Sequence, residues 1–164
     1  MVAVLPLQDN RLADFEPLFK AYYEELDCED DAQETLDGYV MPDIMAGMIF
    51  VDLIYEDDVP CGFAIRQTDD IDNDWCWREG WGDIREMYIA PGFRRRGLGR
   101  FLLYTAEMKL REAGATQAYC LPVPEAEGFF AACGYAKTDQ YDTDTECYVF
   151  EKLDLCNHEC GCAK

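Results

Sequence analysis

The chain has 164 residues, of which 49% are hydrophobic and 13% aromatic, and its formal net charge is -20. The length suits one compact domain, and the apolar content is sufficient for a continuous core, which excludes a disordered chain. The surplus of carboxylates argues against binding to nucleic acid or to an anionic membrane; it favours cationic partners such as amines, or serves solubility alone.

The N-terminal segment, Met1–Asp9, has neither a basic region nor a long apolar run, so no signal peptide is predicted. No stretch approaches the roughly 18 apolar residues that a membrane span needs, and we expect a cytoplasmic protein. In that compartment the nine cysteines, an odd number, are expected to be reduced thiols rather than a disulfide framework.

The first half of the chain is predicted to form short strands and helices. In chain order these are a strand at Val2–Leu5, helices at about 15–25 and 34–45, and strands at 48–55 and 61–67. Asp14 is placed to cap the first helix, whose apolar residues follow helical spacing. Pro42 should interrupt or kink the second helix. The two later strands flank a turn at Glu56–Pro60 and are expected to pair as an antiparallel hairpin.

The second half begins with a polar loop at 69–82 that carries Trp75, Trp77 and Trp81, which either cover a site or pack against the edge of a sheet. The elements predicted next are a strand at 83–90, a helix at 97–113, a strand at 116–121, a short helix at 124–133, and strands at 135–138 and 146–152. We expect one domain at residues 1–154 and an appended cysteine-rich tail at 155–164. Edge strands near the C-terminus permit a homodimer.

The segment Arg94–Arg100, called here the arginine turn, contains four of the chain's fourteen basic residues. It lies between a predicted strand and a predicted helix, whose N-terminus offers unpaired N–H groups and the positive end of the helix dipole. Gly97 and Gly99 leave that backbone open to a ligand. The pattern therefore predicts a site for a pyrophosphate, although a basic turn with a capping glycine is an equally simple interpretation. The absence of a following Gly-Lys-Ser/Thr excludes a P-loop, and the glycine spacing and the lack of an acidic residue on a second strand exclude a dinucleotide fingerprint.

Two longer segments carry a family resemblance. Met87–Leu103, MYIAPGFRRRGLGRFLL, resembles the central motif of the GCN5-related N-acetyltransferase (GNAT) family, and Phe129–Tyr135, FFAACGY, is similar to that family's FYxxxGF segment. The predicted order of elements, βααβββαβαββ, resembles the family from about Val2 to Leu153. The resemblance implies an α/β (α+β) fold with a mixed, mostly antiparallel central sheet of six to seven strands, flanked by about four helices.

The resemblance also implies a function. It indicates an N-acetyltransferase that moves an acetyl group from acetyl-CoA to a primary amine by direct attack in a ternary complex, the acceptor being a small cationic amine or a protein amine. The backbone of Met87, Tyr88 and Ile89 would pair with the pantetheine arm. The residues implied to hold the pyrophosphate are Arg94, Arg95, Arg96, Gly97, Leu98, Gly99 and Arg100.

The catalytic groups are less clearly marked. Spacing from the arginine turn places Asp83 where some family members carry a glutamate base, and Glu86 is the neighbouring candidate; both also suit a solvated strand. Phe130 stands where the family often has a tyrosine that protonates the leaving thiolate. Tyr119, Cys133 or a water could replace it, although a thiol of pKa about 8.5 leaves tolerably without an acid. The loss of that tyrosine leaves open a non-catalytic CoA-binding module or sensor.

The C-terminal tail combines three thiols with the chain's one histidine, at Cys156, His158, Cys160 and Cys162. A Cys3His set suits tetrahedral zinc, but four ligands in seven residues depart from the usual separated pairs. The alternatives are a reduced tail without metal and a metal-responsive tail that controls the domain.

Overall fold

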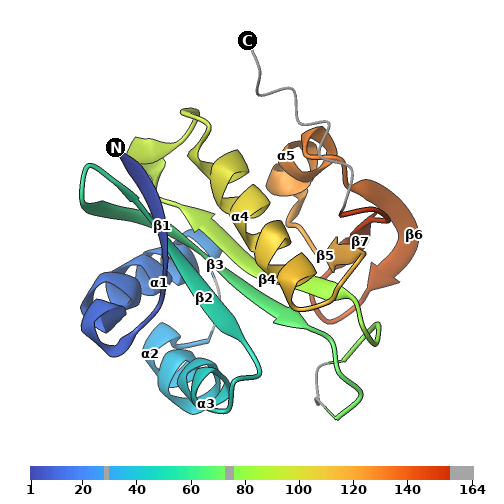
Figure 1. The fold of residues 1–164 in the computed structure, drawn as a ribbon, viewed down its shortest axis with the longest axis horizontal. Coiled ribbons are helices and arrows are strands. Elements are labelled where there is room, and N and C mark those ends of the chain that lie inside the picture. Colours follow the sequence, from blue (N-terminus) through green and yellow to red (C-terminus); the bar gives the residue numbers. More distant parts are fainter. Residues whose placement is uncertain (28–29, 73–75, 156–164) are drawn as a thin grey trace. The chain divides into compact units, whose positions relative to one another are not determined.

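The computed structural model describes residues 1–27, 30–72 and 76–155, and the predicted order of strands and helices is confirmed in them (Figure 1). The strands are β1 (Val2–Pro6), β2 (Phe50–Glu56), β3 (Val59–Thr68), β4 (Gly82–Ile89), β5 (Ala118–Cys120), β6 (Ala136–Asp142) and β7 (Cys147–Lys152). The helices are α1 (Leu12–Leu26), α2 (Ala32–Thr35), the π-helical η2 (Leu36–Val40), α3 (Met41–Met45), α4 (Leu98–Glu112) and α5 (Glu127–Ala132). Single 3-10 turns lie at Asp9–Arg11, Pro91–Phe93 and Pro124–Ala126.

The strands form a seven-stranded sheet in the order β1-β2-β3-β4-β5-β7-β6. Strand β2 pairs antiparallel with both β1 and β3, and β7 pairs antiparallel with both β5 and β6. Strands β4 and β5 are parallel, because the long helix α4 connects them and returns the chain to the same end of the sheet. The mixed, mostly antiparallel sheet that the resemblance implied is thus confirmed.

The chain packs as two compact units. The first contains Met1–Gln67 and Ile84–Ala106, and the second contains Thr68–Asp83 and the chain from Glu107 onward. In the first unit Phe63 of β3 lies edge-on to Phe15 of α1, with ring centroids 5.2 Å apart. Around this pair the buried core gathers Leu18, Phe19, Leu36, Ile49, Val51, Leu53, Tyr55, Ile65 and Tyr88.

The second unit contains a buried ion pair. Lys152 of β7 donates to both carboxylate oxygens of Glu107 in α4, at 3.1 and 2.9 Å, and to the carbonyl of Cys133 at 3.2 Å. Glu107 is only 2% exposed, so this one ammonium group connects α4, α5 and β7 within the unit. Leu155 is also packed into this unit: it is fully buried, and its N–H donates to the carbonyl of Thr116.

Two details of the N-terminal helices differ from expectation or refine it. The prediction that Asp14 caps the first helix is wrong: α1 begins at Leu12, and the Asp14 carboxylate accepts a hydrogen bond from Tyr55 at 2.8 Å. The interruption expected at Pro42 takes the form of the π-helical segment η2, which ends at Val40, two residues before the proline. The wider turn accommodates a residue that has no N–H to donate to the preceding turn.

The predicted hairpin turn is confirmed, and it is tighter than expected. Asp57 and Asp58 have φ angles of 51° and 64°. Two consecutive left-handed residues form the type I′ geometry whose twist matches that of the flanking strands, and aspartate tolerates this conformation. Pro60 consequently lies inside β3 rather than in the turn.

Candidate active site

The backbone of the arginine turn has the conformation of an anion-binding nest. Arg95 and Gly97 have φ angles of 64° and 83°. Left-handed residues in a short turn direct successive N–H groups toward one concave surface, and a non-glycine residue held there carries strain that a ligand site can use. The first bond of the helical ladder runs from the N–H of Phe101 to the carbonyl of Gly97, so the N–H groups of residues 98–100 precede the ladder.

Side chains hold this turn in place. The guanidinium of Arg94 donates to the carbonyl of Ile89 and to the carboxylate of Glu25, each at 2.6 Å. Its pKa is raised, mainly by the hydrogen bond to Glu25. Arg96 pairs with Glu56 at 2.5 Å. These pairs are solvent-exposed and therefore weak, about 0–1 kcal/mol each, so an incoming anion can exchange for the carboxylates.

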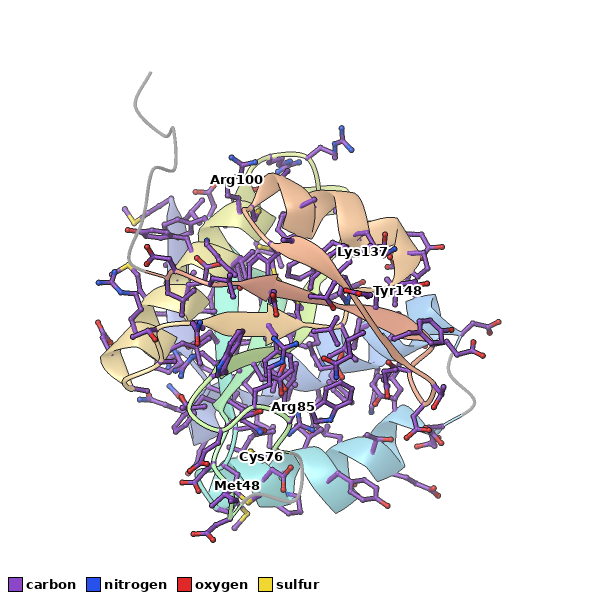
Figure 2. All side chains as sticks on the ribbon, turned by 90° about the vertical axis from the view of Figure 1, so that its right-hand side faces the viewer. Met48, Cys76, Arg85, Arg100, Lys137 and Tyr148 are labelled. Carbon is purple, nitrogen blue, oxygen red and sulfur yellow. The ribbon has the colours of Figure 1, made fainter. Side chains whose placement is uncertain are left out.

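The remaining arginines of the turn face solvent. Arg95 is exposed, and it makes no hydrogen bond or ion pair within the described residues. Arg100 is also exposed in the first turn of α4, where Figure 2 labels it. Leu98 is 4% exposed and anchors the start of the helix in the core. The structure thus places the seven residues of the arginine turn together, with charge on the outside and one buried anchor.

One edge of β4 is available next to this turn. In the described part of the chain, β4 pairs with β5 only at Gly82 opposite Ala118 and at Asp83 opposite Tyr119. The backbone of Met87–Ile89 therefore lies beyond the paired part, and an extended ligand chain can add to such an edge. On its other side β4 approaches β3 closely: a Cβ added at Gly62 would lie 2.3 Å from the Tyr88 carbonyl oxygen.

Glu86, one of the two predicted bases, lies beside a tyrosine in the first unit. It is half-buried on β4 and accepts a hydrogen bond from the hydroxyl of Tyr22 on α1. Loss of hydration raises the pKa of Glu86, while the hydrogen bond from Tyr22 and the charge of Arg85 oppose that rise. Arg85 itself is held by Gln67 at 3.1 Å and by Asp43 at 3.7 Å.

The other two predicted catalytic residues lie together in the second unit. Tyr119 is 1% exposed and donates its hydroxyl hydrogen to Asp69 at 2.8 Å. Burial first, and then the charges of Asp83 and Asp69, raise the pKa of Tyr119 far above its usual range. Asp83 is also buried and lies opposite Tyr119 in the β4–β5 pairing. The hydrogen bond to Asp69 gives Tyr119 a structural partner, and the raised pKa makes Tyr119 a weak proton donor.

The substituted tyrosine position is filled by a packed ring. Phe130 of α5 is 6% exposed and meets Phe129 and Tyr135 edge-on, with centroids 5.2 and 5.5 Å away. Cys133 is half-buried at the end of α5, where its carbonyl accepts from Lys152. Phe130 therefore contributes apolar packing and has no proton to transfer.

The candidate zinc ligands Cys156, His158, Cys160 and Cys162 lie outside the described residues. Among residues 1–27, 30–72 and 76–155, no group of three or more His, Cys, Asp and Glu side chains is arranged to hold a metal ion. In the same residues no helix combines the length and the apolar character needed to cross a bilayer.

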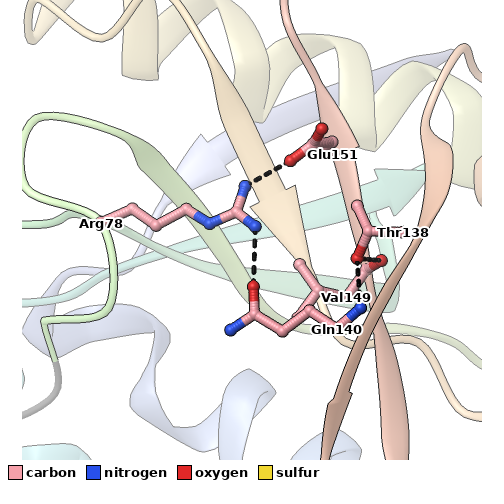
Figure 3. Close-up of polar contacts among 5 residues, drawn as sticks. All are labelled: Arg78, Thr138, Gln140, Val149 and Glu151. Carbon is pink, nitrogen blue, oxygen red and sulfur yellow. Dashed lines mark hydrogen bonds and ion pairs between the residues drawn. The ribbon is translucent and has the colours of Figure 1, made fainter.

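Three residues that support the candidate catalytic side chains were not identified from the sequence: Tyr22, Asp69 and Arg78. Tyr22 follows the apolar spacing of α1. A tyrosine hydroxyl on such a face needs a hydrogen-bond partner, but the sequence does not show which residue provides it. Asp69 accepts from the N–H groups of Trp77 and Arg78, and Arg78 pairs with Glu151 (Figure 3). Contacts across 73 residues leave no local pattern in the sequence.

Comparisons with known proteins agree with this geometry. The sequence profile described as the acetyltransferase (GNAT) family matches residues 12–135. A GNAT acetyltransferase from Staphylococcus aureus Mu50 has a similar structure, with 12% identity, a TM-score of 0.74, and coverage of 94% of this chain and 99% of that chain. The paia N-acetyltransferase of Thermoplasma acidophilum, solved in complex with coenzyme A, has 14% identity, a TM-score of 0.69, and coverage of 93% and 98%.

A third similar structure is AAC(6')-Iy, solved in complex with the bisubstrate analogue CoA-S-monomethyl-acetylneamine. It has 18% identity, a TM-score of 0.71, and coverage of 87% of this chain and 95% of that chain. No curated protein matches the sequence. Because the family profile spans most of the chain and the fold agrees, this protein belongs to the acetyltransferase (GNAT) family.

Proposed function

We propose that this protein transfers an acetyl group from acetyl-CoA to a primary amine on a cationic acceptor, by direct attack in a ternary complex. The observation that carries the proposal is the arginine turn, in which left-handed Arg95 and Gly97 precede the N-terminus of α4. A diphosphate suits this site because it offers several oxygens to main-chain N–H groups and to guanidinium groups at once. The coenzyme A and the CoA conjugate bound to two of the similar proteins support the same assignment.

The acetyl donor would be held by two adjacent segments. The arginine turn would bind the pyrophosphate through its backbone, with Arg95 and Arg100 adding charge. The edge of β4 at Met87–Ile89, which lies beyond the pairing with β5, would bind the pantetheine arm as an extra strand would. A main-chain N–H of this segment would also stabilise the negative charge that develops on the thioester carbonyl oxygen.

Glu86 is our proposed general base. The attacking amine must be neutral, and a lysine-type amine has a pKa of about 10.4, so its proton must be removed. As the amine nitrogen forms its bond to the carbonyl carbon and the C–S bond breaks, Glu86 would take the amine proton directly or through a water. The raised pKa of Glu86 favours this role, since a half-buried carboxylate is a stronger base than an exposed one.

The leaving thiolate has less need of a general acid than the amine has of a general base. A thiolate of pKa near 8.5 can depart without an acid, which is consistent with Phe130 at the position of the usual tyrosine. Asp83 stays a second candidate base. Tyr119 is the weaker candidate acid, because its hydroxyl hydrogen is already donated to Asp69.

The test is thiol release from acetyl-CoA with a panel of mono- and polyamines. We expect release with at least one amine, and a loss of about 100-fold or more in kcat for Glu86→Gln with little change in CoA affinity. Glu112→Gln, at the exposed end of α4, is the matched control and should leave kcat unchanged. If CoA binds but no amine releases thiol, the protein is a CoA-binding module and the enzymatic proposal is wrong.

A further inference from the structure

The segment 22–26 of α1, called here the α1 end, carries acids where a helix favours cations. It contains Glu24 and Glu25 and no basic residue. The C-terminal end of a helix dipole is negative, so carboxylates there destabilise the helix unless a cation compensates them. The buried residues of α1 are Phe15, Leu18 and Phe19, all of which precede the α1 end. The placement of the α1 end therefore depends on contacts made by its own side chains.

Arg94 supplies the compensating cation from the arginine turn, 69 residues further along the chain. Its Nη2 donates to the Glu25 carboxylate at 2.6 Å, and its Nε donates to the carbonyl of Ile89 at 2.6 Å. The guanidinium carbon also lies 5.5 Å from the centroid of the Tyr88 ring, within reach of a cation–π contact. These three contacts fix the orientation of the guanidinium, and they connect the α1 end to the C-terminal end of β4.

A second contact connects the α1 end to β4. The hydroxyl of Tyr22 donates to Glu86, and the ring of Tyr22 lies 5.7 Å from that of Tyr88. Tyr22 lies three residues before Glu25, so the two side chains are neighbours on the surface of α1. Tyr88 touches both connections, through the ring of Tyr22 and the guanidinium of Arg94. A continuous set of contacts thus joins Glu86 to the arginine turn, and all of it lies within the first unit.

The polar groups that act on Glu86 come from two elements. Loss of hydration raises the pKa of Glu86, and the hydrogen bond from Tyr22 of α1 and the charge of Arg85 on β4 oppose that rise. Arg85 is itself paired with Asp43 of α3 at 3.7 Å. A carboxylate near Glu86 would raise its pKa, so the removal of a negative charge alone lowers that pKa. The loss of the hydrogen bond from Tyr22 has the opposite sign.

We propose that Glu25 and Arg94 are positioning residues for the acetyl transfer: their ion pair holds the α1 end against β4, so that Tyr22 keeps its hydrogen bond to Glu86. The pair does not touch the reacting atoms and acts through Tyr22. This inference rests on the proposed function, because it takes Glu86 to be the base. Within the arginine turn, Arg94 then supports α1 rather than serving as the main source of charge for the diphosphate.

The test is the pKa of the Glu86 carboxyl, followed by NMR at its carboxyl carbon during a pH titration of the free protein. Glu25→Gln should raise this pKa, because the α1 end is released and Tyr22 leaves the carboxylate more often. Glu24→Gln is the matched control: it removes the same charge from the same exposed helix turn, leaves the pair of Glu25 and Arg94 in place, and should not raise the pKa. Adding Glu25→Gln to Tyr22→Phe should cause no further rise, since the effect passes through Tyr22.

The same shift has a kinetic consequence. On the rising limb of kcat/KM, where the base is mostly protonated, Glu25→Gln should be about 2- to 5-fold slower than the wild type, which corresponds to the loss of one exposed ion pair. Above that limb the two proteins should be equally fast, because Glu86 is ionised in both.

Three outcomes separate this inference from its alternatives. A pKa of Glu86 that is unchanged or lower in Glu25→Gln would overturn the proposal, because only charge would then connect the two residues. A further rise when Glu25→Gln is added to Tyr22→Phe would overturn it too, since the effect would bypass Tyr22. The expected NMR shifts without thiol release from any amine would support the contacts and overturn the enzymatic function on which their role rests.

Discussion

Strand β4 has a connection of functional interest at each end, and the two differ in charge and in construction. The loop Asp69–Trp81, called here the tryptophan loop, precedes β4 and carries Trp77, which is 42% exposed. The arginine turn follows β4 and presents main-chain N–H groups among guanidinium groups. The second connection therefore suits a polyanion. In a chain with a net charge of -20, the arginines at the second connection would allow the proposed anionic cosubstrate to bind.

The two connections also depend on different kinds of contact. The arginine turn needs two left-handed residues and a helix start, all within a few residues of one another. The tryptophan loop needs Tyr119, Gln140 and Glu151, which lie far along the chain. Changes in the turn should therefore act on ligand affinity, whereas changes in the loop's supports should act first on stability. The following predictions test that contrast from the largest expected effect to the smallest.

The largest effect is expected from Asp69→Ala. Three donors would lose their acceptor in a buried place, where each unsatisfied group costs about 1–3 kcal/mol. We expect the free energy of unfolding in urea to fall by about 3 kcal/mol. Asp70→Ala, at the neighbouring exposed position, should change it by less than about 0.5 kcal/mol. Equal unfolding midpoints for the two variants would contradict the role given to Asp69.

The next effect concerns the backbone of the arginine turn. Gly97 has φ +83° and open space around an added Cβ, so Gly97→Ala strains the turn without a clash. A left-handed alanine costs about 1–2 kcal/mol, and we expect the dissociation constant for CoA to rise about 10-fold. Gly92→Ala is the matched control, because Gly92 has equal space and is not left-handed. An equal CoA affinity in both variants would show that the nest is not used.

A smaller effect is expected from Arg95→Gln. Arg95 is exposed, and within the described chain no carboxylate pairs with it, so its charge is available to a phosphate. We expect CoA binding to weaken about 5-fold and to become less sensitive to salt, because one ionic contact is lost. Arg111→Gln, at the exposed end of α4, supplies the control for a simple change in net charge. A similar loss in both would indicate long-range attraction only.

The smallest effect is a shift in pH dependence. The hydroxyl of Tyr22 stabilises ionised Glu86, so Tyr22→Phe should raise the pKa of Glu86 further. The base must be deprotonated to act, and activity rises with pH through its pKa. The rising limb of kcat/KM should therefore move to higher pH in Tyr22→Phe and stay in place in Tyr39→Phe, an exposed tyrosine. If the rising limb of kcat/KM stays at the same pH in Tyr22→Phe, the base is another residue, and Asp83 is the next candidate.

The sequence predicts what is encoded locally. The arginine turn, the helix after it and the hairpin at Asp57 and Asp58 all follow from residues adjacent in the chain, and the structure confirms these elements. Asp14 was misjudged because a capping pattern cannot reveal that its carboxylate is bound by Tyr55 of β2. Predictions about single side chains fail where a distant partner decides their role.

The candidate site shows the same division. Spacing alone selected both Asp83 and Glu86, and only packing separates them: Tyr22 of α1 reaches Glu86, while Asp83 lies opposite Tyr119. Tyr119 looked available in the sequence, yet the structure gives its hydroxyl to Asp69. The exposure of Trp77 likewise could not be predicted, because an exposed ring and a buried ring look the same in a sequence.

The central claim is that the arginine turn binds the diphosphate of coenzyme A. It is tested most directly by calorimetric titration of the folded protein with CoA and with acetyl-CoA, beside the double variant Arg95→Glu, Arg96→Glu. We predict a saturable heat for both ligands in the wild type and a large loss of affinity in the double variant. No heat with either ligand, or the same affinity after both charges are reversed, would contradict the account.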